Sequence, residues 1–268
     1  MDAQGVYLYC FARAGVARGV KVTGMNGGEV AAIVHGEVAG VVSYVSLEEF
    51  DGDGAERNTQ NPEWVIPRAY LHDVVIQEAM RWSPVLPVRF GAVFASRGAV
   101  EELLARQGKE ISSFLETMTD KEEWAVKGLM ESEKAGAWLV ETTPMLAEQR
   151  DRMSRSPGAR YFQEKKFEAE VQKRSKAWQR EVAERVVEEL KASAADACPL
   201  RLQPKAAASG HREMIFNCAF LVRRDGIERF RRGVEDLRER HRQPGLTFSM
   251  TGPWPPYNFC PSMGATQG

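Results

Sequence analysis

The sequence lacks the patterns that membrane and disulfide-stabilised proteins require. Its four cysteines are scattered over 268 residues, which predicts reduced thiols in a cytosolic protein rather than a disulfide framework. No apolar run approaches the roughly 20 residues of a membrane-spanning helix. The opening residues carry no basic segment and lead directly into a strand pattern, so we expect no signal peptide. These absences favour a soluble cytoplasmic protein that does not bind a lipid membrane.

An excess of charge of one sign is also missing. The chain has 36 Lys and Arg residues against 37 Asp and Glu residues, so no global basic field favours nucleic acid as a partner. What the sequence does contain is enough apolar material for real cores, since 43% of its residues are hydrophobic. A chain of this length is most often two domains.

The arrangements that carry catalysis are missing as well. The four histidines, His35, His72, His211 and His241, are far apart in the sequence, and no Gly-x-Ser-x-Gly elbow or Gly-rich phosphate loop is present. No His or Cys pair has the spacing of metal ligands. His72 could serve catalysis from a helix face, but a single structural hydrogen bond is the more common role. We therefore expect no catalytic residue, no cofactor and no metal.

The first 118 residues predict an N-terminal α+β domain. Strands are expected at 6–12, 20–23, 30–34, 38–46 and 85–94, and helices at 62–81 and 99–116. Asn61 followed by Pro62 has the chemistry of a helix start, and Ser96 is expected to cap the second helix. The acidic, Gly-rich stretch 48–61 is interpreted as a surface loop.

Residues 119–268 predict a second domain of the α+β class. Strands are expected at 122–130, 198–202, 214–222 and 246–250, helices at 144–153, 161–191 and 227–241, and a flexible loop at 204–210. The order strand, helix, strand, strand, helix, strand is that of a ferredoxin-like βαββαβ fold. Its first helix is long and broken, and forms a helical insertion at about 144–192.

A rigid aromatic segment follows the last predicted strand. Three of the four residues 253–256 are proline, which excludes a helix or a central strand. Trp254, Tyr257 and Phe259 lie among these rigid residues, and disordered tails are poor in aromatic side chains. We expect this segment to act mainly as a structural clasp docked on the protein, with Trp254 and Tyr257 as anchors.

Two polar residues within apolar strand patterns are further candidates. Arg89 lies in the pattern 85–94, where a charge is costly unless it is paired or exposed. It is expected to be an exposed edge residue or half of a structural ion pair. Asn217 is expected on the strand face opposite Phe216 and Cys218, where it bonds locally or faces a neighbour.

Several segments together resemble the gas vesicle protein F/L family. They occur in order along nearly the whole chain: Tyr7-Leu8-Tyr9, Val85-Leu86-Pro87-Val88-Arg89-Phe90-Gly91, Trp124-Ala125-Val126-Lys127, Ser156-Pro157-Gly158 with Tyr161, Asn217-Cys218-Ala219-Phe220-Leu221-Val222, and Thr251-Gly252-Pro253-Trp254-Pro255-Pro256-Tyr257-Asn258-Phe259. The Leu-Pro-Val-Arg-Phe-Gly pattern and the terminal Gly-Pro-Trp-Pro-Pro-Tyr pattern are specific in combination.

The resemblance implies a non-enzymatic accessory or minor structural protein of gas vesicles, the gas-filled protein shells that give some microbes buoyancy. It also implies a two-domain fold with a ferredoxin-like second domain, and a cytoplasmic location in association with the vesicle. The implied partners are the small hydrophobic shell protein, during nucleation or assembly, and other accessory proteins. Candidate structural or shell-contact residues are Arg89, Asn217, Trp254, Tyr257 and Phe259.

Two other classes of function stay open from the residues alone. An enzyme or small-ligand binder would have a concave polar pocket near Arg89 or Asn217. An oligomeric scaffold would pair through the long helix 161–191, whose apolar stripe and alternating charges also fit a partner helix.

Overall fold

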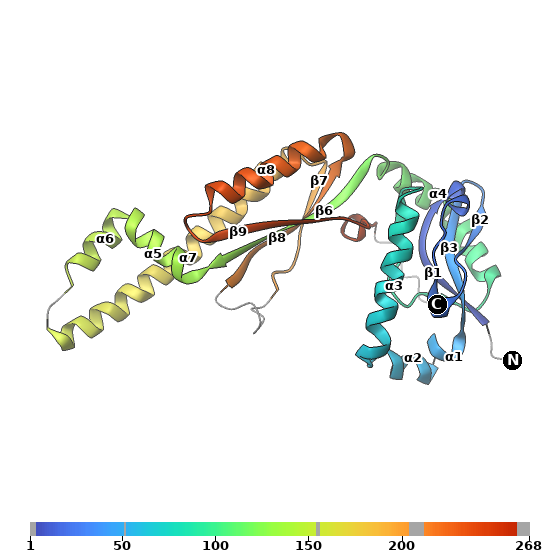
Figure 1. Ribbon diagram of the computed structural model, residues 1–268, viewed down its shortest axis with the longest axis horizontal. Helices are drawn as coiled ribbons and strands as arrows, with labels where there is room; N and C mark the ends of the chain where they lie inside the picture. Colours follow the sequence, from blue (N-terminus) through green and yellow to red (C-terminus); the bar gives the residue numbers. More distant parts are fainter. Residues whose placement is uncertain (1–3, 51, 154–155, 204–211, 262–268) are drawn as a thin grey trace. The chain divides into compact units, whose positions relative to one another are not determined.

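The computed structural model describes residues 4–50, 52–153, 156–203 and 212–261. These residues form two compact units (Figure 1), one containing residues 4–122 together with 254–261 and the other containing residues 123–253. The boundary predicted from the sequence ended the first domain at residue 118 and assigned the C-terminal segment to the second domain. The segment groups with the first unit because Pro255 and Pro256 are buried and Tyr257 bonds to Asp73.

The first unit is built on an antiparallel sheet with the order β2-β3-β1-β4, and β5 also pairs with β1. Its strands are β1 (Gln4–Arg13), β2 (Ala31–His35), β3 (Val38–Ser46), β4 (Val85–Pro87) and β5 (Val93–Phe94). β2 and β3 form the predicted hairpin, and its turn places Gly36 at a positive φ of 57°, a conformation that glycine adopts without steric cost.

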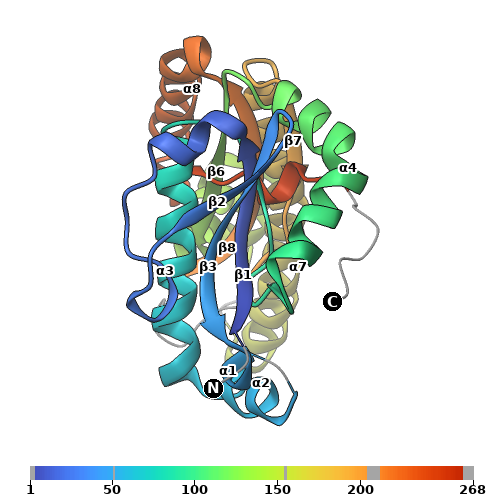
Figure 2. The same cartoon turned by 90° about the vertical axis from the view of Figure 1, so that its right-hand side faces the viewer.

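Two helices cover opposite faces of this sheet, as Figure 2 shows for α3 (Pro62–Met80) and α4 (Arg97–Thr117). The register of β1 shifts between Leu8 and Cys10, so the alternation of its side chains changes phase there. Tyr7, Tyr9 and Cys10 therefore all join the core shared with α3. Both predicted caps are present, because Asn61 Oδ1 accepts from Glu63 N and Ser96 Oγ accepts from Ala99 N.

The acidic stretch that was predicted as a loop is helical instead. It forms α1 (Leu47–Phe50) and α2 (Gly52–Thr59). Phe50 packs its ring 5.5 Å from that of Tyr7 and 5.2 Å from that of Trp64, and Asn58 donates to the carbonyl of Glu49. These long-range contacts order a sequence whose glycines and acids favour a loop.

Two strand predictions in the first unit are also corrected. Residues 85–94 form two short strands rather than one, because the chain leaves the sheet between Pro87 and Val93 and Gly91 takes a φ of 89°. Residues 20–23 make only an isolated bridge, between Thr23 and Glu29.

The second unit contains a four-stranded sheet with the order β7-β8-β6-β9. Its elements are β6 (Lys121–Glu131), α5 (Ser132–Thr142), α6 (Pro144–Asp151), α7 (Pro157–Lys191), β7 (Asp196–Pro199), β8 (Arg212–Arg223), α8 (Ile227–Arg240) and β9 (Leu246–Trp254). Helix α5 was not predicted from the sequence. The predicted loop 204–210 lies outside the described residues.

The core of this unit lies between the sheet and the apolar faces of α7 and α8. It includes Val182, Val186 and Leu190 of the predicted stripe, three residues of α8, and several large side chains of the strands, among them Phe216, Phe220 and Phe248. Each such burial contributes roughly 1.5–3 kcal/mol. Gly128 leaves room for two of these side chains, since a Cβ there would lie 2.9 Å from Cβ of Phe216 and 3.0 Å from the Phe248 ring.

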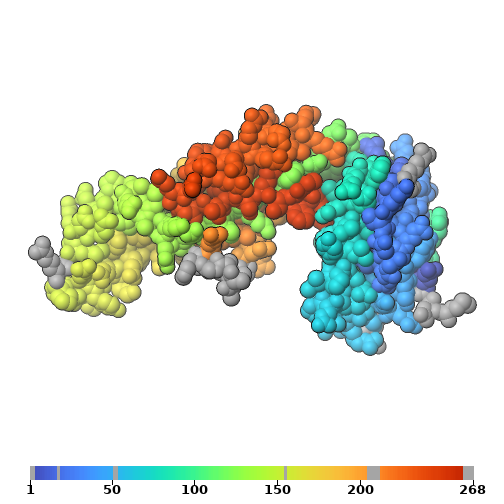
Figure 3. Space-filling model, viewed as in Figure 1, coloured from blue at the N-terminus to red at the C-terminus, as the bar shows by residue number. Residues whose placement is uncertain are grey.

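The remaining helices of the second unit project beyond its sheet (Figures 1 and 3). We call α5, α6 and residues 157–180 of α7 the helical arm. Its base is held by the rings of Trp138 and Trp178, whose centroids are 5.2 Å apart. The predicted long helix is thus present, and its N-terminal half packs against α5 and α6 rather than on the sheet.

Candidate binding surface

A buried chain of hydrogen bonds fixes α3 against the sheet of the first unit. The amide of Gly91 donates to Tyr7 Oη at 3.1 Å, and Tyr7 Oη lies 2.9 Å from Nδ1 of His72. Nε2 of His72 lies 3.1 Å from the carbonyl of Val88. A carbonyl only accepts, so Nε2 carries the proton and Nδ1 accepts from the tyrosine hydroxyl.

This arrangement makes His72 a structural residue. Its side chain is 2% exposed, and burial lowers its pKa below the usual 6.5, which keeps the imidazole neutral. Burial also raises the pKa of Tyr7, the largest influence on that hydroxyl. Both ring nitrogens of His72 are used internally, so the histidine is not available as a base. The predicted single structural hydrogen bond is in fact two.

The C-terminal segment is attached to the same helix one residue further on. Tyr257 Oη donates to Asp73 Oδ1 at 3.3 Å. Burial and the neighbouring Asp73 carboxylate raise the pKa of Tyr257, so the hydroxyl stays protonated and donates. Trp254 and Tyr257 each keep 39% of their surface exposed, whereas the two prolines between them are buried. The Gly252–Pro253 peptide bond before them is cis.

Arg89 lies in the strand-free segment between β4 and β5 and is exposed, which is one of the two positions expected for it. That segment meets α3 at His72, and Tyr257 meets α3 at Asp73. We call Arg89, Trp254, Tyr257 and the half-buried Phe259 the C-terminal surface. The sequence indicated these residues separately, but nothing in it identified Asp73, 184 positions away, as the partner of Tyr257.

Asn217 lies elsewhere, on β8 of the second unit. Its side chain is 9% exposed and Nδ2 donates to the carbonyl of Arg201, 16 positions earlier, at 2.9 Å. Its Oδ1 is buried and has no hydrogen-bond partner among the described residues. The structure therefore shows Asn217 in a hydrogen bond within the second unit.

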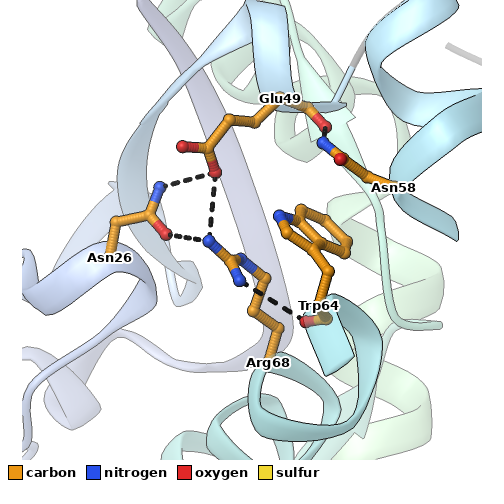
Figure 4. A network of polar contacts seen from close by, with 5 residues as sticks. All are labelled: Asn26, Glu49, Asn58, Trp64 and Arg68. Carbon is orange, nitrogen blue, oxygen red and sulfur yellow. Dashed lines mark hydrogen bonds and ion pairs between the residues drawn. The ribbon is translucent and has the colours of Figure 1, made fainter. Parts of the chain in front are cut away.

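A second polar cluster, shown in Figure 4, joins α3 to the α1–α2 turn and was not predicted. Arg68 Nη2 lies 3.1 Å from Asn26 Oδ1 and 3.4 Å from Glu49 Oε2. The guanidinium carbon lies 4.3 Å from the centroid of the Trp64 ring. Asn26 adopts a positive φ of 54° to reach this position, a conformation that asparagine tolerates better than most residues. The cluster is an internal tether.

The structure has two cavities whose linings include neither Arg89 nor Asn217. One, of about 380 Å³, lies between α6 and α7 and is lined by Met145, Met153 and polar side chains. The other, of about 360 Å³, lies between residues 192–195 and 223–229.

Two of the cysteines are buried, and no metal site is found among the described residues. Burial raises the pKa of the Cys10 thiol and raises that of Cys218 to about 12, so both stay as unreactive thiols. No described group of His, Cys, Asp and Glu side chains could hold a metal ion. Among the helices described, none combines the length and apolar character that crossing a membrane requires.

Comparison with known proteins agrees with the architecture and with the motif order. The profile of the family described as gas vesicle synthesis protein GvpL/GvpF matches residues 5–261. Gas vesicle protein L of Streptomyces sp. (strain CB03234) is 26% identical over 238 residues, covering 88% of this chain and 85% of its own. Gas vesicle protein F of the same strain is 28% identical over 190 residues, covering 70% of this chain and 75% of its own.

Solved structures share the fold over nearly the whole length. The crystal structure of GvpF from Anabaena sp. PCC7120 aligns with a TM-score of 0.70 at 19% identity, covering 96% of this chain and 98% of that one. GvpF from Microcystis aeruginosa gives a TM-score of 0.66 at 18% identity, and the alignment covers 96% of this chain and 99% of that one. This chain therefore belongs to the GvpL/GvpF family of gas vesicle synthesis proteins.

Proposed function

We propose that this protein is a non-enzymatic accessory component that binds the small hydrophobic shell protein in the cytoplasm and supports nucleation or assembly of the gas vesicle. Membership of the GvpL/GvpF family supports a gas vesicle role. A shell subunit with exposed apolar surface is prone to aggregate, and a partner that covers this surface suppresses aggregation. Other accessory proteins are further proposed partners. We also interpret the second unit as ferredoxin-like, since its strand order β7-β8-β6-β9 fits that topology.

The observation that carries the proposal is the aromatic exposure of the C-terminal surface. Trp254 and Tyr257 each expose 39% of their surface on a segment made rigid by proline. Rigid aromatic side chains give large contact areas at low entropic cost and are enriched among the residues that dominate binding. We place the shell-protein contact on Trp254, Tyr257 and Phe259, with Arg89 as a further candidate.

The test is co-expression of the tagged full-length chain with the shell protein. Soluble and co-purified shell protein are then measured. The wild-type chain should keep the shell protein soluble and retain it on the affinity resin. The Trp254→Ala variant should retain about tenfold less, the effect of losing an interface aromatic worth about 1.4 kcal/mol.

Two controls separate contact from folding. Trp82→Ala removes another exposed tryptophan of the first unit and should bind normally. Thermal unfolding of each variant is measured in parallel. Loss of binding with unchanged stability makes Trp254 a contact residue. Lower stability with unchanged binding makes the segment a structural clasp and removes it as the contact. No association of the wild-type chain in either assay overturns the proposed function.

A further inference from the structure

Charge is distributed very unevenly between two parts of this nearly neutral chain. Residues 144–180 of the helical arm contain ten Lys and Arg residues against five Asp and Glu residues. Residues 47–81, which form α1, α2 and α3, contain eight acidic residues against three basic residues. A local excess of each sign on one molecule creates complementary fields that steer association.

Within residues 144–180, all five acidic residues are used internally. Each of the five forms an ion pair with a neighbouring Arg or Lys on α6 or α7. Four exposed cations form no ion pair among the described residues: Lys166, Lys173, Lys176 and Arg180. The surplus positive charge is therefore carried by side chains that are available to a partner.

The same part of the arm exposes apolar side chains. Tyr161 is 58% exposed and Phe162 is 70% exposed, with ring centroids 5.8 Å apart. Met145 is 50% exposed and lines the groove of about 380 Å³ between α6 and α7. Methionine adapts its shape to a partner surface, and aromatic residues form the centres of interfaces.

The acidic region pairs the opposite charge with matching apolar side chains. Glu63, Ile66 and Tyr70 follow one another at steps of three and four on α3, which places them on one face of the helix. Ile66 is 66% exposed and Tyr70 is 72% exposed. Glu56 and Glu63 are exposed and form no ion pair within the described parts of the chain. We call Glu56, Glu63, Ile66 and Tyr70 the α3 face.

We propose that the helical arm of one copy of this chain docks on the α3 face of a second copy. Each surface supplies exposed apolar side chains together with unpaired charges of one sign, and the two signs are opposite. The two surfaces differ, so the contact is head-to-tail, and each added copy leaves a free arm and a free α3 face. Such a contact builds open-ended chains unless its rotation closes a ring.

The test measures the mass of the purified full-length chain by sedimentation velocity over a range of concentrations and salt. The mass should rise with concentration, and association should weaken at high salt because screening shortens the reach of charges to below about 8 Å. A chain that stays monomeric at every concentration overturns the proposal. Because no shell protein is present, this result is independent of shell binding.

Charge reversal identifies the two surfaces. The arm variant, Lys166→Glu with Lys173→Glu, and the α3 variant, Glu56→Lys with Glu63→Lys, should each weaken self-association about tenfold or more. A chain that carries both sets should associate nearly as well as the wild type, because the signs match again. The control, Arg229→Glu with Arg232→Glu on α8, changes charge equally and should associate normally.

The combined variant decides between head-to-tail and other contacts. Its recovery supports pairing of the arm with the α3 face. Failure of the combined variant to recover overturns the proposal, as does a closed dimer that the α3 variant leaves unchanged, since that dimer would pair arm with arm.

Discussion

The hydroxyl of Tyr7 lies 2.9 Å from Nδ1 of His72 and joins the central strand of the first unit to α3. The same oxygen accepts from the amide of Gly91. One atom thus links three segments: β1, α3 and the connection between β4 and β5.

Removing that atom should destabilise the first unit. Tyr7→Phe leaves the amide of Gly91 and Nδ1 of the buried His72 without a partner, which should lower the free energy of unfolding by about 1–3 kcal/mol. The control is Tyr70→Phe, at a side chain that is 72% exposed, and it should change stability little. Urea unfolding followed by circular dichroism measures both. Equal stability of the two variants would contradict the structural role of the Tyr7 hydroxyl.

Stability should fall as pH decreases below 6.5, the usual histidine value. Burial lowers the pKa of His72 in the folded chain, so between the folded and unfolded pKa values the unfolded state binds more protons. The His72 contribution is therefore full above 6.5 and is lost as pH falls through the folded pKa. Burial and the nearby Arg240 and Arg185 lower the pKa of His241 in the same direction.

The measurement is the free energy of unfolding at a series of pH values on both sides of 6.5. His72→Gln should be less stable than the wild type at neutral pH and should show a shallower decline below it. His35→Gln, at the exposed last residue of β2, should keep the wild-type slope. An unchanged slope in the His72 variant would assign the decline to other groups.

Gly252 should not tolerate a side chain. Its φ is 142°, and a Cβ would lie 2.9 Å from the carbonyl oxygen of Glu123 and 3.0 Å from the Trp124 ring. Gly252→Ala should therefore destabilise the chain by about 1–3 kcal/mol. Gly226→Ala is the matched control, because no atom lies within 4 Å of a Cβ at that position. Differential scanning calorimetry compares the two, and the prediction is wrong if both variants melt alike.

Phe220 should dominate the core of the second unit. Its side chain is 0% exposed, and its ring centroid lies 5.2 Å from that of Phe230. Phe220→Ala should cost about 3–5 kcal/mol through lost burial and the cavity left behind. Phe162→Ala removes the same atoms from a side chain that is 70% exposed, and in dilute solution it should cost far less. Guanidinium unfolding of the two variants gives the comparison.

Elements with strong local signals could be predicted from the sequence. Asn61 and Ser96 start their helices as expected, since a side-chain oxygen that accepts from a nearby amide acts within a few residues. The apolar stripe of α7 could be predicted because apolar residues at helical spacing mark the buried face of a helix, independent of which element packs on it. The family resemblance came from motifs in order along the chain, and it is confirmed by the match over residues 5–261.

What could not be predicted depends on contacts distant in sequence. The helices α1 and α2 form in a stretch with loop chemistry because Phe50 packs against Tyr7 and Trp64. α5 has no side-chain cap at its start and contains Gly136 in its interior, so its local signal is weak. The bond from Tyr257 to Asp73 crosses 184 positions, and no spacing rule reaches that far.

The division of the chain has a consequence for its synthesis. The first unit uses residues from both ends, whereas the second is a continuous stretch within it. During translation the whole second unit emerges before Trp254 and Tyr257, and domains generally fold as units as they emerge. The α3 site for Tyr257 therefore stays unfilled until residues 254–261 have emerged, so the first unit is completed only after the second has been synthesised.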